Sequence, residues 1–250
     1  MNSYSNQIYT IKWANKIKQS LIISIDYSKS PENPYPNALN DVWQAYNYII
    51  KHLPKKLNVI FNSVILAGDS AGGNLCVGLL NLLIQEKKMD IMPDGLQLTY
   101  PALGLQKSFF SPSKLYSLTE YIMPASFLQI CLECYIPENY RTFLGDFDSL
   151  LSPVLIENSI IQKFPKCFIN CGELDPLLDD TVRFFYKINL NRNGTLRIFK
   201  GLGHGYINYG MKFGVGMSAS QKCIDYVIYC LILLIQDKRK KKTQAFFEKN

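Results

Sequence analysis

Five short β-rich runs alternate with helix-like stretches along this chain, and this alternation restricts the fold more than any other feature. The apolar residues of the runs are nearly continuous, which is typical of strands covered on both faces. Repeated strand–helix–strand units predict an α/β fold with a mostly parallel sheet flanked by helices. The runs are SLIISID (20–26), SVILAG (63–68), GLQLTYP (95–101), KCFINCG (166–172) and TLRIFKG (195–201), and the helices are expected at 37–52, 70–87, 179–192 and 218–236.

Length and composition fit a single domain of this kind over residues 1–236. The chain has 250 residues, of which 48% are hydrophobic and 19% charged, as in ordinary globular proteins. The stretch 102–165 breaks the alternation, and we expect a lid-like insertion there over the carboxyl ends of the strands. Its aromatic residues either line an apolar pocket or pack the insertion onto the body; they are Phe109, Phe110, Tyr116, Tyr121, Phe127, Tyr135, Tyr140, Phe143 and Phe147.

The positive charge is concentrated at one end of the chain. The net charge is +7, and DKRKKK at 237–242 holds five Lys or Arg residues, so 237–250 is interpreted as a basic C-terminal tail. The remainder is close to neutral, which argues against a nucleic-acid partner. The apolar run YVIYCLILLI (226–235) is too short to span a bilayer and is interpreted as a buried helix. The alternative is peripheral contact of this run and the tail with an anionic membrane or lipid droplet.

The cysteines and the N-terminus bear on cofactors and location. The seven cysteines follow no disulfide pattern, and no His cluster completes a metal site with Cys131 and Cys134. We therefore expect reduced thiols and neither a metal nor an organic cofactor. The first residues, MNSYSNQIYTIKWANK, lack the apolar core of a signal peptide. Together these features favour a cytoplasmic protein.

The motif GDSAG at 68–72 supplies the first candidate for chemistry, Ser70. It lies between a predicted strand and a predicted helix, which is the position of a nucleophile elbow. We expect both flanking glycines to be needed, because side chains two positions from the serine would clash in so tight a turn. The hydroxyl is then exposed at the sheet edge, beside the positive end of the following helix.

A serine hydroxyl needs a base, and this chain has only two histidines. His52 ends a predicted helix and is expected to cap it. His204 lies in GLGHGYIN, directly after the last predicted strand, where the base of such an enzyme is expected. His204 is therefore the candidate base.

The carboxylate that orients the base is expected in CGELDPLLDD, which follows the run 166–172. Glu173 and Asp175 lie on the loop itself, whereas Asp179 and Asp180 are expected to cap the next helix. Asp175 is preferred because the adjacent proline stiffens its loop. Ser70, Asp175 and His204 would then follow three strands of one sheet.

Four motifs resemble the hormone-sensitive lipase group of α/β hydrolases in their order and residues. They are DYSKSPENPYPNALNDV (26–42), GDSAGGN (68–74), DPLLDD (175–180) and GHGY (203–206), and SPSKLYSL favours the hormone-sensitive lipase branch over bacterial members. The resemblance extends from about residue 8 to 235. It implies an α/β-hydrolase fold, Ser70 as nucleophile, Asp175 as orienting acid, His204 as base and the Ala71 N–H in the oxyanion hole.

The chain departs from the group in two respects. The long regulatory insertion of mammalian members is absent, since LSPVL (151–155) follows the lid-like stretch closely. The glycine-rich HGGG loop, which supplies oxyanion donors, should precede Met1, so the chain is expected to be truncated there. Loss of one donor typically lowers the rate ~10²–10³-fold. The family's strand before that loop would also be missing, so the runs 20–26 and 63–68 must pair directly or leave a gap.

The sequence as a whole predicts a serine carboxylester hydrolase, a lipase or esterase that cleaves an apolar acyl ester such as an acylglycerol or sterol ester. The alternative is a catalytically weak or inactive relative that binds a small apolar ligand or a protein partner. A peptidase or another acyl transferase on the same scaffold is a third hypothesis, which no feature of the sequence favours.

Overall fold

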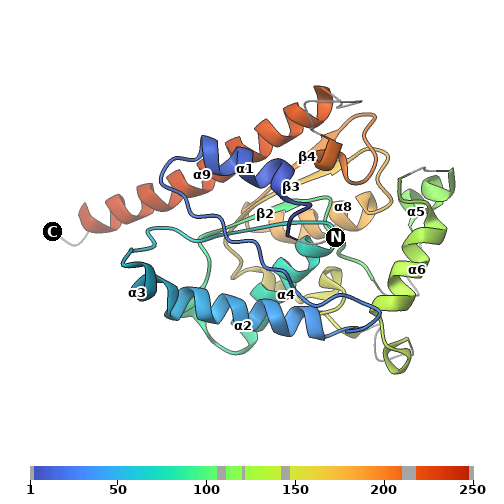
Figure 1. The fold of residues 1–250 in the computed structure, drawn as a ribbon, viewed down its shortest axis with the longest axis horizontal. Helices are drawn as coiled ribbons and strands as arrows, with labels where there is room; N and C mark the ends of the chain where they lie inside the picture. The colour runs from blue at the N-terminus through green and yellow to red at the C-terminus, as the bar shows by residue number, and fades with distance from the viewer. Residues whose placement is uncertain (1–2, 106–110, 120–121, 142–146, 210–217, 248–250) are drawn as a thin grey trace.

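Within the residues that the structure describes, four parallel strands form one sheet in the order β1-β2-β3-β4 (Figure 1). The computed structural model describes residues 3–105, 111–119, 122–141, 147–209 and 218–247. The strands are β1 (Ile65–Asp69), β2 (Gly95–Thr99), β3 (Lys166–Gly172) and β4 (Gly194–Phe199). The predicted α/β fold with a parallel sheet is confirmed, and four of the five expected runs are strands.

Helices separate the strands as the alternation predicts. The expected helices 37–52, 70–87 and 179–192 correspond to α2, α4 and α8, and the expected helix 218–236 continues through Phe247. The helices are α1 (Gln7–Lys16), α2 (Asn37–Lys51), α3 (Leu53–Leu57), α4 (Ala71–Gln85), α5 (Pro112–Tyr116), α6 (Ala125–Tyr135), α7 (Asn158–Ile161), α8 (Leu178–Asn189) and α9 (Ser218–Phe247).

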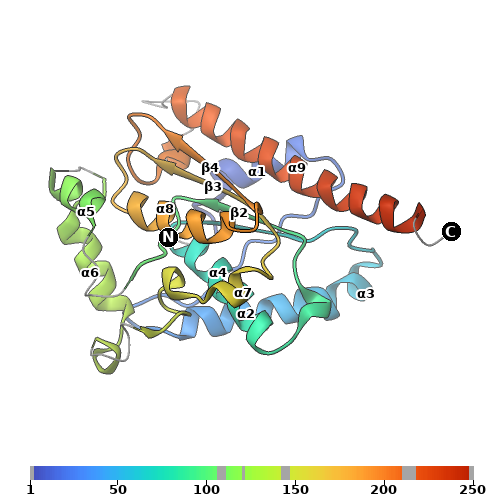
Figure 2. The ribbon, with the colours of Figure 1, turned by 180° about the vertical axis from the view of Figure 1, so that it is seen from behind.

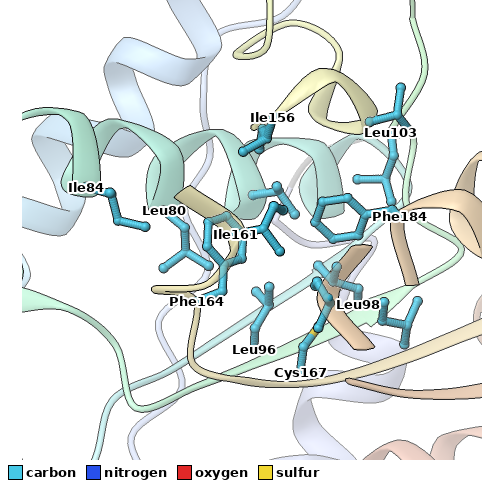
Figure 3. Packing of buried hydrophobic residues seen from close by; sticks show 14 residues of the cluster. Leu80, Ile84, Leu96, Leu98, Leu103, Ile156, Ile161, Phe164, Cys167 and Phe184 are labelled. Atoms are coloured by element: carbon cyan, nitrogen blue, oxygen red, sulfur yellow. The ribbon is translucent and has the colours of Figure 1, made fainter. Parts of the chain in front are cut away.

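The helices cover both faces of the sheet, as strands with continuous apolar residues require (Figures 1 and 2). On one face Leu96 and Leu98 of the sheet pack with Leu80 of α4 and Phe184 of α8 (Figure 3). On the other face α1 and α9 pack together over the sheet, where Trp13 and Val227 share a second apolar cluster. The sheet is therefore a buried scaffold whose strand ends carry the connecting loops.

Phe184→Ala is expected to lower the free energy of unfolding by about 3–5 kcal/mol, because it removes a fully buried ring and leaves a cavity. The ring packs edge-on against Phe164, with 6.4 Å between the ring centroids. Urea unfolding followed by circular dichroism measures the change. Tyr186→Ala is the matched control on the same helix, since Tyr186 is 66% exposed. Equal losses in the two variants would contradict the packing described.

The strand expected at 20–26 is not formed, and this prediction is wrong. Residues 20–27 have no regular secondary structure, and none of the backbone groups of 21–27 bonds to another backbone group in the part of the chain that the structure describes. The ends of the segment 18–27 are held elsewhere, since the Ile17 N–H bonds to Trp13 O and the Ser28 N–H to Asp41 Oδ2 at 2.8 Å. β1 is therefore an edge strand, and a gap replaces direct pairing.

Helix α9 is a further element whose sequence allowed two interpretations. The run 226–235 alone is too short to span a bilayer, but the helix over Ser218–Lys238 is long and apolar enough by length and composition, and 44% of an 18-residue apolar window within it is buried. Val227, Cys230 and Leu234 are buried, and Leu234 packs with Phe168 of β3. This packing supports the interpretation of the apolar run as a helix buried against the sheet.

Candidate active site

Ser70 lies in a strained turn between β1 and α4. Its φ is 53° and its ψ −120°, a backbone conformation that residues with a side chain rarely adopt. The Ser70 N–H donates to Thr99 O at 3.0 Å, which ties the turn to the end of β2. The predicted position of the serine between a strand and a helix is confirmed.

The glycines around Ser70 do not all serve the role expected of them. A Cβ at Gly68 would lie 2.3 Å from Gly72 O, so no side chain fits there. A Cβ at Gly72 would meet nothing within 4 Å, and the expectation of a clash at this position is wrong. The constrained glycine on the helix is Gly73, where a Cβ would lie 2.7 Å from Pro101 Cβ. The turn therefore leaves no room for a side chain at Gly68 or Gly73, whereas a side chain at Gly72 would face open space.

Gly68→Ala is expected to lower the free energy of unfolding by about 3 kcal/mol, because the added methyl group must displace backbone atoms. Gly72→Ala is the matched control and should keep or slightly raise the melting temperature, since alanine favours the helix. Thermal unfolding of both variants gives the comparison. A stable Gly68→Ala protein would contradict the close approach of Gly68 to the first turn of α4.

The three predicted site residues lie together at the carboxyl ends of the strands. His204 Nε2 lies 2.9 Å from Ser70 Oγ, and His204 Nδ1 lies 2.9 Å from Asp175 Oδ2. Asp175 is 1% exposed and His204 5% exposed, so water is largely excluded from their hydrogen bond. The Leu177 N–H donates to Asp175 Oδ1 at 2.9 Å, which leaves the other carboxylate oxygen for the imidazole. The arrangement can deliver the serine proton to a buried, oriented histidine.

The other candidates considered from the sequence lie outside this chain of hydrogen bonds. Glu173 Oε2 accepts the Gly201 N–H at 2.9 Å instead of approaching the imidazole. The expectation that Asp179 and Asp180 cap α8 is wrong: α8 begins at Leu178 without a side-chain cap, and both carboxylates contact α5 instead. His52 ends α2, as predicted.

Three residues that sequence reasoning missed surround the serine and histidine. The centroid of the Tyr100 ring lies 4.7 Å from that of the His204 ring, and Tyr100 has a positive backbone φ of 36°. Asp69 accepts a hydrogen bond from Tyr9 at 2.8 Å and one from Tyr100 at 3.4 Å. Burial raises the pKa of the Asp69 carboxyl, and the Tyr9 hydrogen bond partly opposes this. Tyr100 could have been found from its position at the end of a predicted strand, whereas no feature of the sequence pointed to Tyr9.

The first turn of α4 places backbone N–H groups next to Ser70. Ala71 is the first residue of this helix, so its N–H has no intrahelical acceptor. The positive end of the helix dipole adds to the field at Ser70. The Ala71 N–H is thus available for negative charge that develops next to Ser70 Oγ.

A cavity of about 1980 Å³ opens beside Ser70 and His204. It extends between β1 and the segment 18–27, so the space beside this edge strand is continuous with the site. From the insertion, Ile122, Met123 and Leu128 line it, together with Phe127 and Tyr135 of the nine predicted aromatic residues. Tyr140 instead packs against Tyr35, Tyr116 and Phe147 are exposed, and Phe109, Phe110, Tyr121 and Phe143 lie outside the described residues.

A parallel α/β sheet with a strained serine after one strand, and an acid and a histidine after two others, defines a hydrolase-type scaffold. Comparison with known families agrees with this class. A family model described as the alpha/beta hydrolase fold matches residues 10–208, most of the chain. The chain therefore belongs to the alpha/beta hydrolase fold family, and the predicted fold class is confirmed.

Individual relatives share parts of the chain. Hormone-sensitive lipase of Bos taurus is 40% identical over 134 residues, which are 53% of this chain and 17% of that protein. Carboxylesterase NlhH of Mycobacterium tuberculosis is 26% identical over 201 residues, or 77% of this chain and 58% of that one. The chain thus spans less than two thirds of either relative. Carboxyl esterase 2 of Tuber melanosporum superposes with a TM-score of 0.79 at 19% identity, covering 92% of this chain and 72% of that structure.

Proposed function

We propose that this protein is a serine carboxylester hydrolase in which Ser70 is the nucleophile, His204 the base and Asp175 the orienting acid. The observation that carries the proposal is the continuous pair of hydrogen bonds, each 2.9 Å, from Ser70 Oγ through His204 to Asp175. The similarity to an esterase and to hormone-sensitive lipase supports an ester as substrate.

The proposed reaction follows from these contacts. Ser70 Oγ attacks the ester carbonyl carbon while His204 Nε2 takes the hydroxyl proton, and Asp175 stabilises the resulting imidazolium. The tetrahedral oxyanion accepts a hydrogen bond from the Ala71 N–H, which lies at the positive end of α4. Collapse of this intermediate breaks the ester C–O bond, and His204 gives its proton to the leaving alcohol. Water activated by His204 then hydrolyses the acyl-enzyme and regenerates Ser70.

The shape and lining of the cavity favour an apolar acyl chain. Ile122, Met123 and Phe127 border it near the insertion, and Ile22, Ile25 and Leu66 border it near the gap. Burial of each acyl CH₂ against such side chains contributes about 0.8 kcal/mol. We therefore propose acylglycerol, sterol or similar lipid esters as the substrate class. A cytoplasmic location and contact of residues 237–250 with a lipid surface stay predictions of the sequence.

A fluorophosphonate probe and a series of p-nitrophenyl esters test this function. We expect stoichiometric labelling of Ser70 and a kcat/KM that rises with acyl length. Binding of a fluorescent fatty acid without labelling or turnover would instead favour the ligand-binding alternative. Equal rates for acetyl and long-chain esters would contradict the proposed substrate class but not the reaction.

A further inference from the structure

The insertion is attached to the loop that carries Asp175 through one serine. Ser113 Oγ in α5 donates to Pro176 O at 2.9 Å. The Ser113 N–H donates to Asp179 Oδ2 at 2.7 Å, and the Asp179 N–H donates back to Ser113 Oγ at 3.3 Å. Three hydrogen bonds thus join one residue of the insertion to both ends of the short segment 176–179. We call this set of contacts the Ser113 clasp.

The clasp acts on the residue next to the proposed acid. Pro176 has no N–H, so its own hydrogen bonding to the rest of the protein depends on its carbonyl. That carbonyl accepts from Ser113, while the Leu177 N–H holds Asp175 Oδ1. The Asp175 carboxylate is therefore held by the Leu177 N–H of its own turn. That turn is itself held by Ser113 of the insertion, through the Pro176 carbonyl.

A second contact joins the same two elements. Lys114 Nζ lies 3.1 Å from Asp180 Oδ2, and the Asp180 side chain is fully buried. Lys114 Nζ also donates to Gly104 O at 3.3 Å, at the point where the chain leaves the sheet for the insertion. An ion pair of this kind keeps α5 against α8 while Ser113 sets the finer position of the loop.

The insertion is also the element that meets substrate. Ile122, Met123 and Phe127, which follow α5 closely in the chain, line the cavity beside Ser70. The short 3-10 helix η2 (Ser117–Thr119) packs against both α5 and α6, so a displacement of Phe127 in α6 by an acyl chain would reach α5. Because α5 holds the turn at Pro176, the displacement would reach the Asp175–His204 hydrogen bond.

Building on the proposed function, we propose that Ser113 is a positioning residue whose bond to the Pro176 carbonyl keeps Asp175 aligned with His204, so that the lid-like insertion and the catalytic acid are mechanically coupled. Ser113 contacts no reacting atom. Its effect passes entirely through the turn of residues 175–178.

The proton shared by His204 Nδ1 and Asp175 Oδ2 gives a readout that does not depend on turnover. We expect a downfield imidazole N–H resonance in the proton NMR spectrum of the protein, assigned with His52→Gln because the chain has only one other histidine. Ser113→Val should broaden or abolish this resonance, whereas Ser113→Thr, of the same shape but with a hydroxyl, should keep it. Ser117→Ala is the control within the insertion, because Ser117 Oγ donates only to Lys114 O, at 2.7 Å, and should also keep it.

Ester hydrolysis gives the second readout. Ser113→Val should lower kcat about tenfold with KM unchanged, which corresponds to about 1.4 kcal/mol in the activation free energy. Ser113→Thr should restore most of the rate, and Ser117→Ala should stay within about twofold. A wild-type protein without esterase activity would overturn the proposed function, while the NMR comparison would still decide the positioning role.

Two results would overturn the coupling. One is a Ser113→Val protein that keeps the downfield resonance with wild-type sharpness. The other is equal loss of the resonance in the Thr and Val variants, which would assign the effect to side-chain size and not to the hydrogen bond. Melting temperatures of the two variants show whether either has lost its fold, and the Thr–Val comparison holds because both carry the same added volume.

Discussion

Ser70→Ala is expected to lower kcat for p-nitrophenyl ester hydrolysis by about 10⁴–10⁶-fold and to abolish fluorophosphonate labelling. Ser70 Oγ lies 2.9 Å from His204 Nε2, at the carboxyl edge of the sheet and beside the open cavity. Its removal takes away the atom that would form the acyl-enzyme and leaves the histidine without a proton to accept. Steady-state kinetics with an active-site titration measure the effect.

Histidine variants supply the controls for this experiment. His204→Gln should lower kcat to nearly the same extent, and the double variant with Ser70→Ala should be no slower than either single variant, because the two residues act as a unit. His52→Gln should keep the wild-type rate, since His52 ends α2 on the exposed surface. Retention of a tenth of the wild-type rate by Ser70→Ala would contradict the assignment of the nucleophile.

Much of the fold could be predicted from the sequence because strand and helix periods differ strongly in this chain. The runs at 63–68, 95–101, 166–172 and 195–201 match strands, since each is rich in apolar residues and helices separate them along the chain. The run 20–26 has the same local pattern, yet it forms no ladder. A strand requires a neighbour within hydrogen-bonding distance, and here a cavity separates the segment from β1. The local pattern carries no information on that separation.

The three residues of the candidate site could be predicted because their motifs follow strands in a fixed order along the chain. Ser70, Asp175 and His204 were placed by motif and by position after strands, and these same residues hydrogen-bond to one another. What sequence reasoning missed depends on residues brought together by packing. Tyr100 meets His204 across the site, and Ser113 meets Asp179 across 66 positions of the chain.

The erroneous assignment of Asp179 shows the physical reason most clearly. An acidic residue in the first turn of a helix is usually interpreted as a cap or as a partner of the helix dipole. Here the Asp179 carboxylate turns away from its helix and accepts the Ser113 N–H of the insertion. A partly buried partner from the insertion therefore replaces the local one, and only the tertiary structure determines which partner is available.

Asp175→Asn is expected to lower kcat about 10⁴-fold while the protein stays folded. The structure fixes the orientation of the new amide. Because the Leu177 N–H donates to the Oδ1 position at 2.9 Å, the amide oxygen must stay there and the NH₂ group must face His204. An NH₂ donor at this place requires Nδ1 to accept, which puts the imidazole proton on Nε2, where it can no longer take the Ser70 proton. The rate should therefore fall far more than the loss of one hydrogen bond would explain.

Glu173→Gln is the matched control for this variant, because Glu173 lies on the same loop but bonds to the Gly201 N–H at 2.9 Å. It should stay within about threefold of the wild-type rate, as expected for an exposed contact. The tautomer argument also predicts a spectroscopic change, since ¹⁵N spectra of His204 should show the proton on Nδ1 in the wild-type protein and on Nε2 in Asp175→Asn. A large loss of rate with the proton still on Nδ1 would mean that Asp175 acts through charge alone, and equal losses in the two variants would remove Asp175 from the proposed mechanism.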